Sequence, residues 1–205
     1  MGRVSDARER LIAATIDLLW ARSHGAVTVD DICARAKVQR GTFYHFFKSK
    51  DDLVLQAIQA DWERRKAQLD ALFSPTVPPL ERLRGCFAAI RERQRDLQQR
   101  LGCVVGPLYS KIGQEVGPAT EIGQLVQRVL QAYARYFESA LRDAAAEGAP
   151  VGDPVASTRA LIAYLEGLAG QARIQNDLSL FDHVEEEAFG VLGLHGTSLS
   201  RAART

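Results

Sequence analysis

The sequence lacks the residues and spacings on which several classes of protein depend. Its 205 residues include only three cysteines, Cys33, Cys86 and Cys103, and no Cys-x-x-Cys pair. This odd number without finger spacing argues against a disulfide framework and against structural zinc, so we expect reduced thiols. The four histidines show no ligand spacing, and neither a phosphate loop nor a dinucleotide fingerprint is present. We therefore expect neither an enzyme nor a protein with a metal or a cofactor.

A long uncharged apolar run is also missing. Asp17 interrupts the apolar part of the N-terminal segment, and no small-residue cleavage site follows it. Neither a signal peptide nor a membrane span is therefore indicated. With 46% hydrophobic and 25% charged residues, the composition is ordinary for a folded protein. We expect a cytoplasmic protein with no membrane partner.

Charge is unevenly distributed along the chain. Residues 1–50 contain nine Lys or Arg against five Asp or Glu, a balance of +4, whereas the whole chain carries only +1. The remaining residues therefore carry −3. A basic head on an acidic body is typical of a chain that presents one end to a polyanion, although a solvated surface would explain the same charges.

The spacing of apolar residues predicts a helical chain almost throughout. A first helix is expected over 7–21, with Gly25 ending it in a left-handed conformation, and a short second helix is expected over 29–36. Ser49 is expected to cap a longer helix that runs to Phe73. Further helices are expected over 80–100, from Pro118 to the residues before Gly148, over 155–175 and over 180–194. We expect an all-α fold with a first helical domain at 1–50, a larger helical domain at 51–195, and a mobile tail at 196–205.

The segment "RGTFYHFFKSK", residues 40–50, places four aromatic rings and a histidine between basic residues. Two short helices joined by a tight turn, with a longer helix behind them, form a helix-turn-helix. The longer stretch "TVDDICARAKVQRGTFYHFFKSKDDLV" resembles the N-terminal DNA-binding region of the TetR family of bacterial transcriptional regulators. The rest of the chain resembles that family only in its helical pattern and length.

The resemblance implies a division of roles within this segment. Phe43 and Phe47 are expected to anchor the second short helix, because so short a helix needs packing. Gln39 and Arg40 are the leading candidates for reading bases, and Lys48 matches the family lysine that contacts a phosphate. Lys37 stands where family members often have glycine, so we expect a left-handed lysine in the turn. The full set expected at DNA is Thr28, Lys37, Gln39, Arg40, Gly41, Thr42, Tyr44, His45 and Lys48.

The resemblance also implies that residues 1–50 are the DNA-binding domain and that residues 51–195 form the domain for effector binding and dimerisation, so that the protein is a homodimer with an effector pocket in its body. Small residues in "ALIAYLEGLAGQA" would permit close helix pairing, and the residues expected at the dimer interface are Leu161, Leu165, Leu168 and Ala169. The residues expected to contact a small-molecule effector are Phe87, Ile90, Cys103, Tyr109, Tyr133, Phe137 and Tyr164. An ordinary packed core would use the same residue types.

The segment "LGCVVGPLYSKIGQEVG" resembles one branch of these regulators, some of which respond to electrophiles or small unsaturated acids. Cys103 is the residue that would act as a thiol sensor, provided that a nearby cation such as Arg100 or Lys111 favours its thiolate. A packing role for Cys103 stays open.

The function expected from the sequence is a ligand-responsive transcriptional regulator. It would bind a palindromic operator as a homodimer and repress until a small molecule or an electrophile releases it. The alternative is a helical scaffold or small-molecule-binding protein without sequence-specific DNA binding. The sequence does not identify the operator, the effector or the regulated genes.

Overall fold

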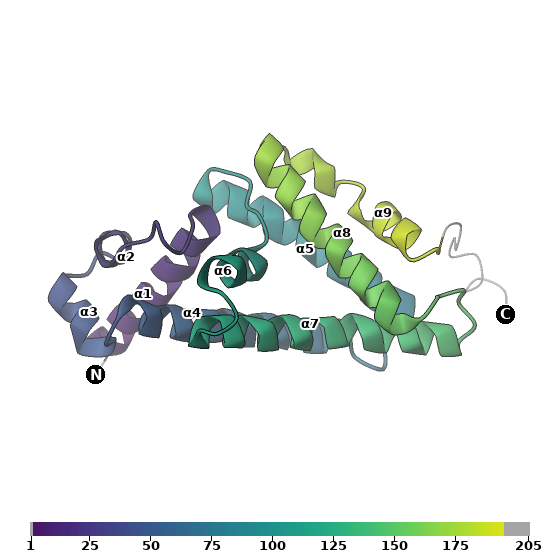
Figure 1. Cartoon of the computed structure of the whole chain (residues 1–205), viewed down its shortest axis with the longest axis horizontal. Coiled ribbons are helices and arrows are strands. Elements are labelled where there is room, and N and C mark those ends of the chain that lie inside the picture. The colour runs from purple at the N-terminus through teal and green to yellow at the C-terminus, as the bar shows by residue number, and fades with distance from the viewer. Residues whose placement is uncertain (1, 195–205) are drawn as a thin grey trace.

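The computed structural model describes residues 2–194, and every secondary-structure element in this range is a helix. Figure 1 shows the arrangement. The elements are α1 (Gly2–Ala21), α2 (Val29–Ala36), α3 (Arg40–Phe46), α4 (Lys50–Leu72), α5 (Pro79–Leu101), α6 (Leu108–Val116), α7 (Glu121–Ala146), α8 (Pro154–Gln175), the short 3₁₀ helix η1 (Leu178–Phe181) and α9 (Val184–Val191). The all-α prediction is therefore confirmed.

Helices α1, α2 and α3 form a small head at one end of the molecule (Figure 1). Thr28 and Asp31 make a capping box at the start of α2, in which each side chain bonds the backbone nitrogen of the other residue. Lys37 follows α2 with φ 54° and ψ 48°, as expected for the turn. This left-handed residue reverses the chain into α3, and the fully buried Phe43 and the buried Phe47 anchor α3 to the core.

The remaining helices form the larger body. Helix α4 runs out of the head and packs on both α1 and α7. Helix α7 also packs on α5, α6 and α8, and α9 lies against α5 and α8. In Figure 1 the molecule outlines a triangle, with α1 along one side, α4 and α7 along the second, α5 and α8 along the third, and α6 between them facing the head. Helix α6 thus lies where the body meets the head.

The predicted start of the first helix, its predicted glycine cap and the predicted start of α7 are wrong. Helix α1 ends at Ala21, as predicted, but it begins at Gly2 rather than at Ala7. Gly25 is not among the described glycines with positive φ, so it does not provide a left-handed cap. Helix α7 begins at Glu121 rather than at Pro118, because the Thr120 side chain accepts a hydrogen bond from the Gly123 nitrogen and acts as the cap. The predicted Ser49 cap is confirmed, and α7 ends before Gly148 as predicted, with Gly148 at a positive φ.

Among residues 2–194, no helix combines the length and apolar character needed to cross a membrane. The same residues contain no group of three or more His, Cys, Asp or Glu that could hold a metal ion. The tail predicted at 196–205 lies outside the described residues.

Candidate functional site

The outer face of α3 carries the side chains that the sequence predicted at DNA. Gln39, Arg40, Tyr44 and His45 are all exposed, and Thr42 is half-buried. Tyr44 keeps 53% of its surface exposed although its ring packs edge-on against buried Phe43 at a centroid distance of 5.0 Å. A large ring held rigidly at the surface suits contact with another molecule.

Arg40 is held in place by its neighbours on this face. Its guanidinium pairs with Asp30 at 3.1 Å and lies 5.8 Å from the centre of the Tyr44 ring. A hydrogen bond to Tyr44 and the charge of Asp30 raise the pKa of Arg40. Because this ion pair is exposed, it adds little stability and can be exchanged for contacts with DNA.

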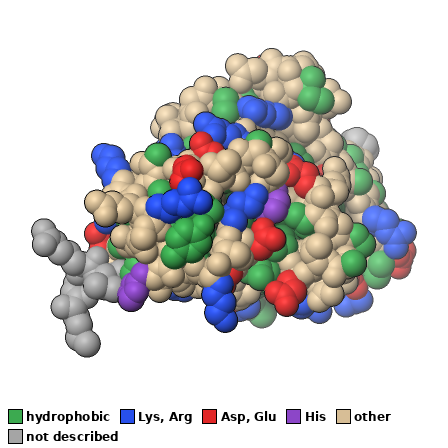
Figure 2. All heavy atoms as spheres, turned by 60° about the vertical axis from the view of Figure 1, so that its left-hand side comes forward, with side chains coloured by type: hydrophobic (Ala, Val, Ile, Leu, Met, Phe, Trp, Pro, Cys, Tyr) green, Lys and Arg blue, Asp and Glu red, His purple; other side chains and the backbone are tan. Residues whose placement is uncertain are grey.

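Lys37 and Lys48 lie at the two ends of the α3 region, and both are exposed. Lys50, in contrast, donates hydrogen bonds of 2.9 and 3.1 Å to the backbone oxygens of His24 and Val27, so this ammonium group supports the fold. Figure 2 shows the face on the head side, where blue Lys and Arg side chains are interspersed with red acidic ones. The basic groups free to contact a phosphate are therefore fewer than the charge count of the sequence suggests.

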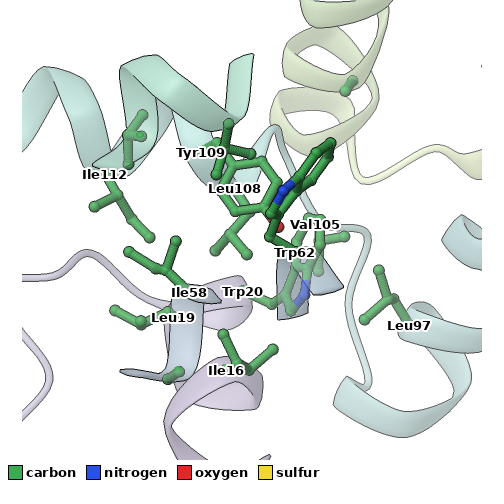
Figure 3. Close-up of a cluster of buried hydrophobic side chains, with 14 of the residues drawn as sticks. Ile16, Leu19, Trp20, Ile58, Trp62, Leu97, Val105, Leu108, Tyr109 and Ile112 are labelled. Carbon is green, nitrogen blue, oxygen red and sulfur yellow. The ribbon is translucent and has the colours of Figure 1, made fainter. Parts of the chain in front are cut away.

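A cavity of about 110 Å³ lies inside the body, below the head. Its walls come from α1, α4, α5, α6, α7 and α8 and from Pro107 before α6. Figure 3 shows Trp20 and Trp62 close to Leu108 and Tyr109 of α6. The lining residues are Trp20, Trp62, Arg65, Ile90, Arg93, Pro107, Leu108, Tyr109, Leu130, Tyr133, Ile162, Leu165, Glu166 and Ala169.

A second groove, of about 530 Å³, runs between α1, α4 and α5. Trp20, Arg65 and Arg93 line both the groove and the cavity. These three side chains therefore form the wall that the cavity and the groove share.

Asp61, Arg65 and Tyr109 form a polar cluster in this wall. The Asp61 carboxylate is buried, lies 2.7 Å from Nε of Arg65 and accepts a 2.7 Å hydrogen bond from the Tyr109 hydroxyl. The Arg65 guanidinium also lies 5.2 Å from the Trp20 ring centre and 5.1 Å from the Tyr109 ring centre. Burial alone would lower the pKa of Arg65, but Asp61 holds it above the ordinary value. Burial raises the pKa of Tyr109, so its hydroxyl stays protonated and donates.

Three of the seven residues predicted to contact an effector line the cavity, namely Ile90, Tyr109 and Tyr133. Phe87 and Phe137 are fully buried in the core, and Tyr164 donates a 2.5 Å hydrogen bond to Glu187. Cys103 lies in the connection between α5 and α6 and does not line the cavity. The sequence interpretation missed both tryptophans and both arginines of the cavity. The sequence did contain a signal for the two arginines, because each is a charged residue within an otherwise apolar helix face.

Cys103 differs from the other two cysteines in being half-buried. Burial raises the pKa of the Cys86 thiol to about 11, so Cys86 is unreactive at neutral pH. The two cations suggested for activating Cys103 have other partners: Arg100 pairs with Asp17 and Asp96, and Lys111 bonds to backbone oxygens of α1.

The residues predicted at the dimer interface divide between the core and the cavity. Leu161 is fully buried within the chain, Leu165 and Ala169 line the cavity, and Leu168 is half-buried. The exposed residues of α8 are a different set, Val155, Ala156, Arg159, Ala160, Ala163, Gly167, Gln171, Arg173, Ile174 and Gln175. In the middle of α8 the exposed residues are the small Ala160, Ala163 and Gly167, whereas Leu161 is buried.

A helix-turn-helix head joined to a helical body with an internal cavity defines the class of ligand-responsive DNA-binding regulators. Residues 11–57 match the family model described as bacterial regulatory proteins of the tetR family. The transcriptional regulator AcuR of Cereibacter sphaeroides is 31% identical over 174 residues, which cover 82% of this chain and 77% of AcuR. The HTH-type transcriptional repressor DhaR of a Mycobacterium species is 29% identical over 138 residues, 65% of each chain.

Solved structures of TetR-family regulators share the fold of this chain. The crystal structure of regulatory protein TetR from Rhodobacter sphaeroides matches with a TM-score of 0.76 and 27% identity over 89% of this chain and 96% of that one. A TetR-family regulator from Agrobacterium tumefaciens matches in fold with a TM-score of 0.82 at 17% identity, covering 93% and 99% of the two chains. The chain belongs to the TetR family of bacterial transcriptional regulators. The electrophile-responsive branch suggested by the Gly-Cys segment is not confirmed.

Proposed function

We propose that this chain is a cytoplasmic repressor that binds a palindromic operator as a homodimer and releases it when a small molecule occupies the cavity. The regulators it resembles include one whose name calls it a repressor. The helices that we assign to DNA binding are α1–α3, and those that we assign to effector binding and dimerisation follow from α4 onward.

The observation that carries this proposal is the contact between the cavity and the end of α1. Trp20 lines the cavity and belongs to the last turn of α1, so a ligand there would contact the head directly. Lys111 of α6 donates hydrogen bonds to the backbone oxygens of Leu19, Trp20 and Arg22. A shift of α6 around a ligand would therefore move α1, which changes the spacing of the two heads in a dimer.

For operator contact, we assign base reading to Gln39 and Arg40, and phosphate contact to Lys37 and Lys48. Thr28, Gly41, Thr42, Tyr44 and His45 complete the proposed surface. For dimerisation, the exposed small residues Ala160, Ala163 and Gly167 of α8 replace the inward leucines as the proposed contact, because small side chains allow two helices to approach closely.

Selection of bound duplexes from a random-sequence library at near-physiological salt tests the proposal. We expect an inverted repeat whose half-sites lie about one helical turn, ~34 Å, apart. Binding to the selected duplex should weaken steeply with salt, by a log-log slope of about −0.9 per neutralised phosphate. Recovery of no enriched sequence from a ligand-free dimer would contradict the proposal and favour a scaffold.

A further inference from the structure

Asp30 is an acidic residue beside the proposed DNA surface. It is the second residue of α2, and its side chain is 70% exposed. The neighbouring Asp31 already completes the cap of α2, because its carboxylate accepts hydrogen bonds of 3.0 and 2.6 Å from the nitrogen and the hydroxyl of Thr28. Among residues 2–194, the Asp30 carboxylate bonds only to Arg40 of α3. Since an acid repels DNA phosphates, its presence here indicates a function connected with Arg40.

The contact between Asp30 and Arg40 occupies one nitrogen of the guanidinium. Nη1 donates to both carboxylate oxygens, at 3.1 and 3.2 Å, and Nη2 donates to the Tyr44 hydroxyl at 3.5 Å. Asp30 therefore does not use the fork in which two nitrogens face two oxygens. Nε and Nη2 retain hydrogen atoms for the two acceptors that guanine presents in the major groove, even while Asp30 stays in contact.

Tyr44 is the second neighbour that holds the guanidinium. Its ring centre lies 5.8 Å from the guanidinium carbon of Arg40, and its ring packs edge-on against the fully buried Phe43. Asp30 belongs to α2 and Tyr44 to α3, so both short helices of the head contribute to the orientation of Arg40. A long side chain that is oriented before binding loses less conformational entropy when it binds.

The same ion pair opposes contact between Arg40 and phosphates. A phosphate contact contributes affinity without sequence information. Asp30 compensates the charge of Arg40 and repels an approaching phosphate, so Arg40 has to give up this pair to bind one. Because the pair is exposed, the effect on affinity should be about two- to fivefold. Base reading through Nε and Nη2 keeps the pair and avoids this cost.

We propose that Asp30 is a specificity-determining residue of this regulator, because it positions Arg40 for base reading and keeps Arg40 off the phosphates of other DNA. Asp30 acts through Arg40 and does not itself contact DNA. This inference rests on the proposed function, because it requires Arg40 at the operator. It adds a residue of α2 that touches no base to the determinants of operator choice.

The variant Asp30→Asn tests the inference, since it removes the charge and keeps the size of the side chain. We would measure binding to the selected operator and to a random-sequence duplex over a range of salt concentrations, and repeat the library selection. Affinity for the random duplex should rise about two- to fivefold, with a log-log salt slope steeper by about 0.9 as Arg40 gains a phosphate. The selected sequences should relax at the bases where Arg40→Ala also relaxes them. An unchanged base preference or an unchanged affinity for the random duplex would each overturn the inference.

Asp51 supplies a matched control. It is the second residue of α4, as Asp30 is of α2, its side chain is 64% exposed, and its partner is His24. Asp51→Asn should therefore keep the base preferences of the wild type, whereas relaxation at the same bases would show a general effect of charge and overturn the inference. Asp30→Glu keeps the charge and should retain the weak binding of the wild type to the random duplex. Urea unfolding of each variant reports whether it is folded.

A double-mutant cycle with Arg40 separates positioning from direct repulsion. In the Arg40→Ala protein, Asp30→Asn should leave the salt slope and the base preferences unchanged, because the group through which Asp30 acts is absent. A salt slope that steepens equally in both backgrounds would show that Asp30 repels phosphates directly, and it would overturn the inference.

The wild type distinguishes failure of this inference from failure of the proposed function. If the wild type selects no sequence from the library, the proposed function itself fails. If the wild type selects an inverted repeat and Asp30→Asn selects the same repeat with the same preferences, only the inference about Asp30 fails.

Discussion

The Nζ atom of Lys111 lies 2.6 Å from the backbone oxygen of Leu19, so a side chain of α6 holds the last turn of α1. The same ammonium group reaches the backbone oxygen of Arg22 at 2.9 Å. The last carbonyls of a helix lack partners within the helix, and a cation there also suits the helix dipole. Because α6 also forms part of the cavity wall, this contact connects the proposed ligand site to the head.

Removal of this ammonium group should weaken both stability and signalling. We expect Lys111→Met to lower the free energy of unfolding by about 2 kcal/mol, because buried carbonyls lose a charged donor. Urea denaturation measures this change, and Lys66→Met, at an exposed ion pair with Asp70, is the control. Operator release by a ligand should also be weaker in the variant. A Lys111→Met protein as stable as the wild type would show that this contact contributes nothing.

The left-handed conformation of Lys37 gives a second prediction. Lysine at φ 54° carries strain of about 1 kcal/mol that glycine would relieve, while glycine costs more entropy on folding. We expect Lys37→Gly to change stability by less than about 1 kcal/mol. If Lys37 contacts a phosphate, Lys37→Gly and Lys37→Asn should both reduce the salt slope of operator binding by about one. An unchanged slope in both variants would remove Lys37 from the DNA surface.

The head could be predicted from sequence because its determinants are local. The Thr28 cap, the turn at Lys37, the Ser49 cap and the spacing of Phe43 and Phe47 all lie within a short stretch of chain. Each signal acts over a few residues, so the sequence specifies both the elements and their order.

The cavity could not be predicted in the same way, because its wall joins distant segments. Arg65 and Arg93 lie on different helices, and Trp20 reads as an ordinary apolar residue of the first helix. Phe87 and Phe137 have the residue type expected of a ligand pocket, yet helix packing places them in the core. The direction of each side chain depended on how α5, α7 and α8 pack, which the periodicity of each helix leaves undetermined.

Arg40 and Lys48 should have different effects on DNA binding. Arg40→Ala should cost about 1 to 3 kcal/mol on the selected operator and relax the preference at one or two bases, as for an arginine that reads a base edge. Lys48→Ala should weaken binding to all sequences alike and reduce the salt slope by about one. Repeating the library selection with each variant distinguishes the two effects. Identical preferences in wild type and Arg40→Ala would exclude base reading by Arg40.

Cys103 should be the reactive thiol of this chain, because Cys33 and Cys86 are buried. We expect N-ethylmaleimide to label the native wild type at one site and to leave Cys103→Ser unlabelled, as read by mass spectrometry. Labelling alone would not show that Cys103 is a sensor. A sensing role also requires that N-ethylmaleimide releases the operator from the wild type but not from Cys103→Ser. Equal retention of DNA by both proteins would leave Cys103 as a packing residue.

Glu166 gives a pH dependence with a defined sign. Burial raises the pKa of its carboxyl above the ordinary value of 4.5, so the native state keeps this proton at pH values where the unfolded chain has lost it. Stability contributed by this group therefore falls as pH rises from about 4.5 through the raised pKa, and it then levels off. Glu166→Gln removes this loss, so its stability relative to wild type should increase over the same pH range. Urea denaturation from pH 4 to pH 8 measures the difference, with the exposed Glu186→Gln as a control that should show no such rise. A constant difference between Glu166→Gln and wild type would mean that the carboxyl is solvated in the native protein.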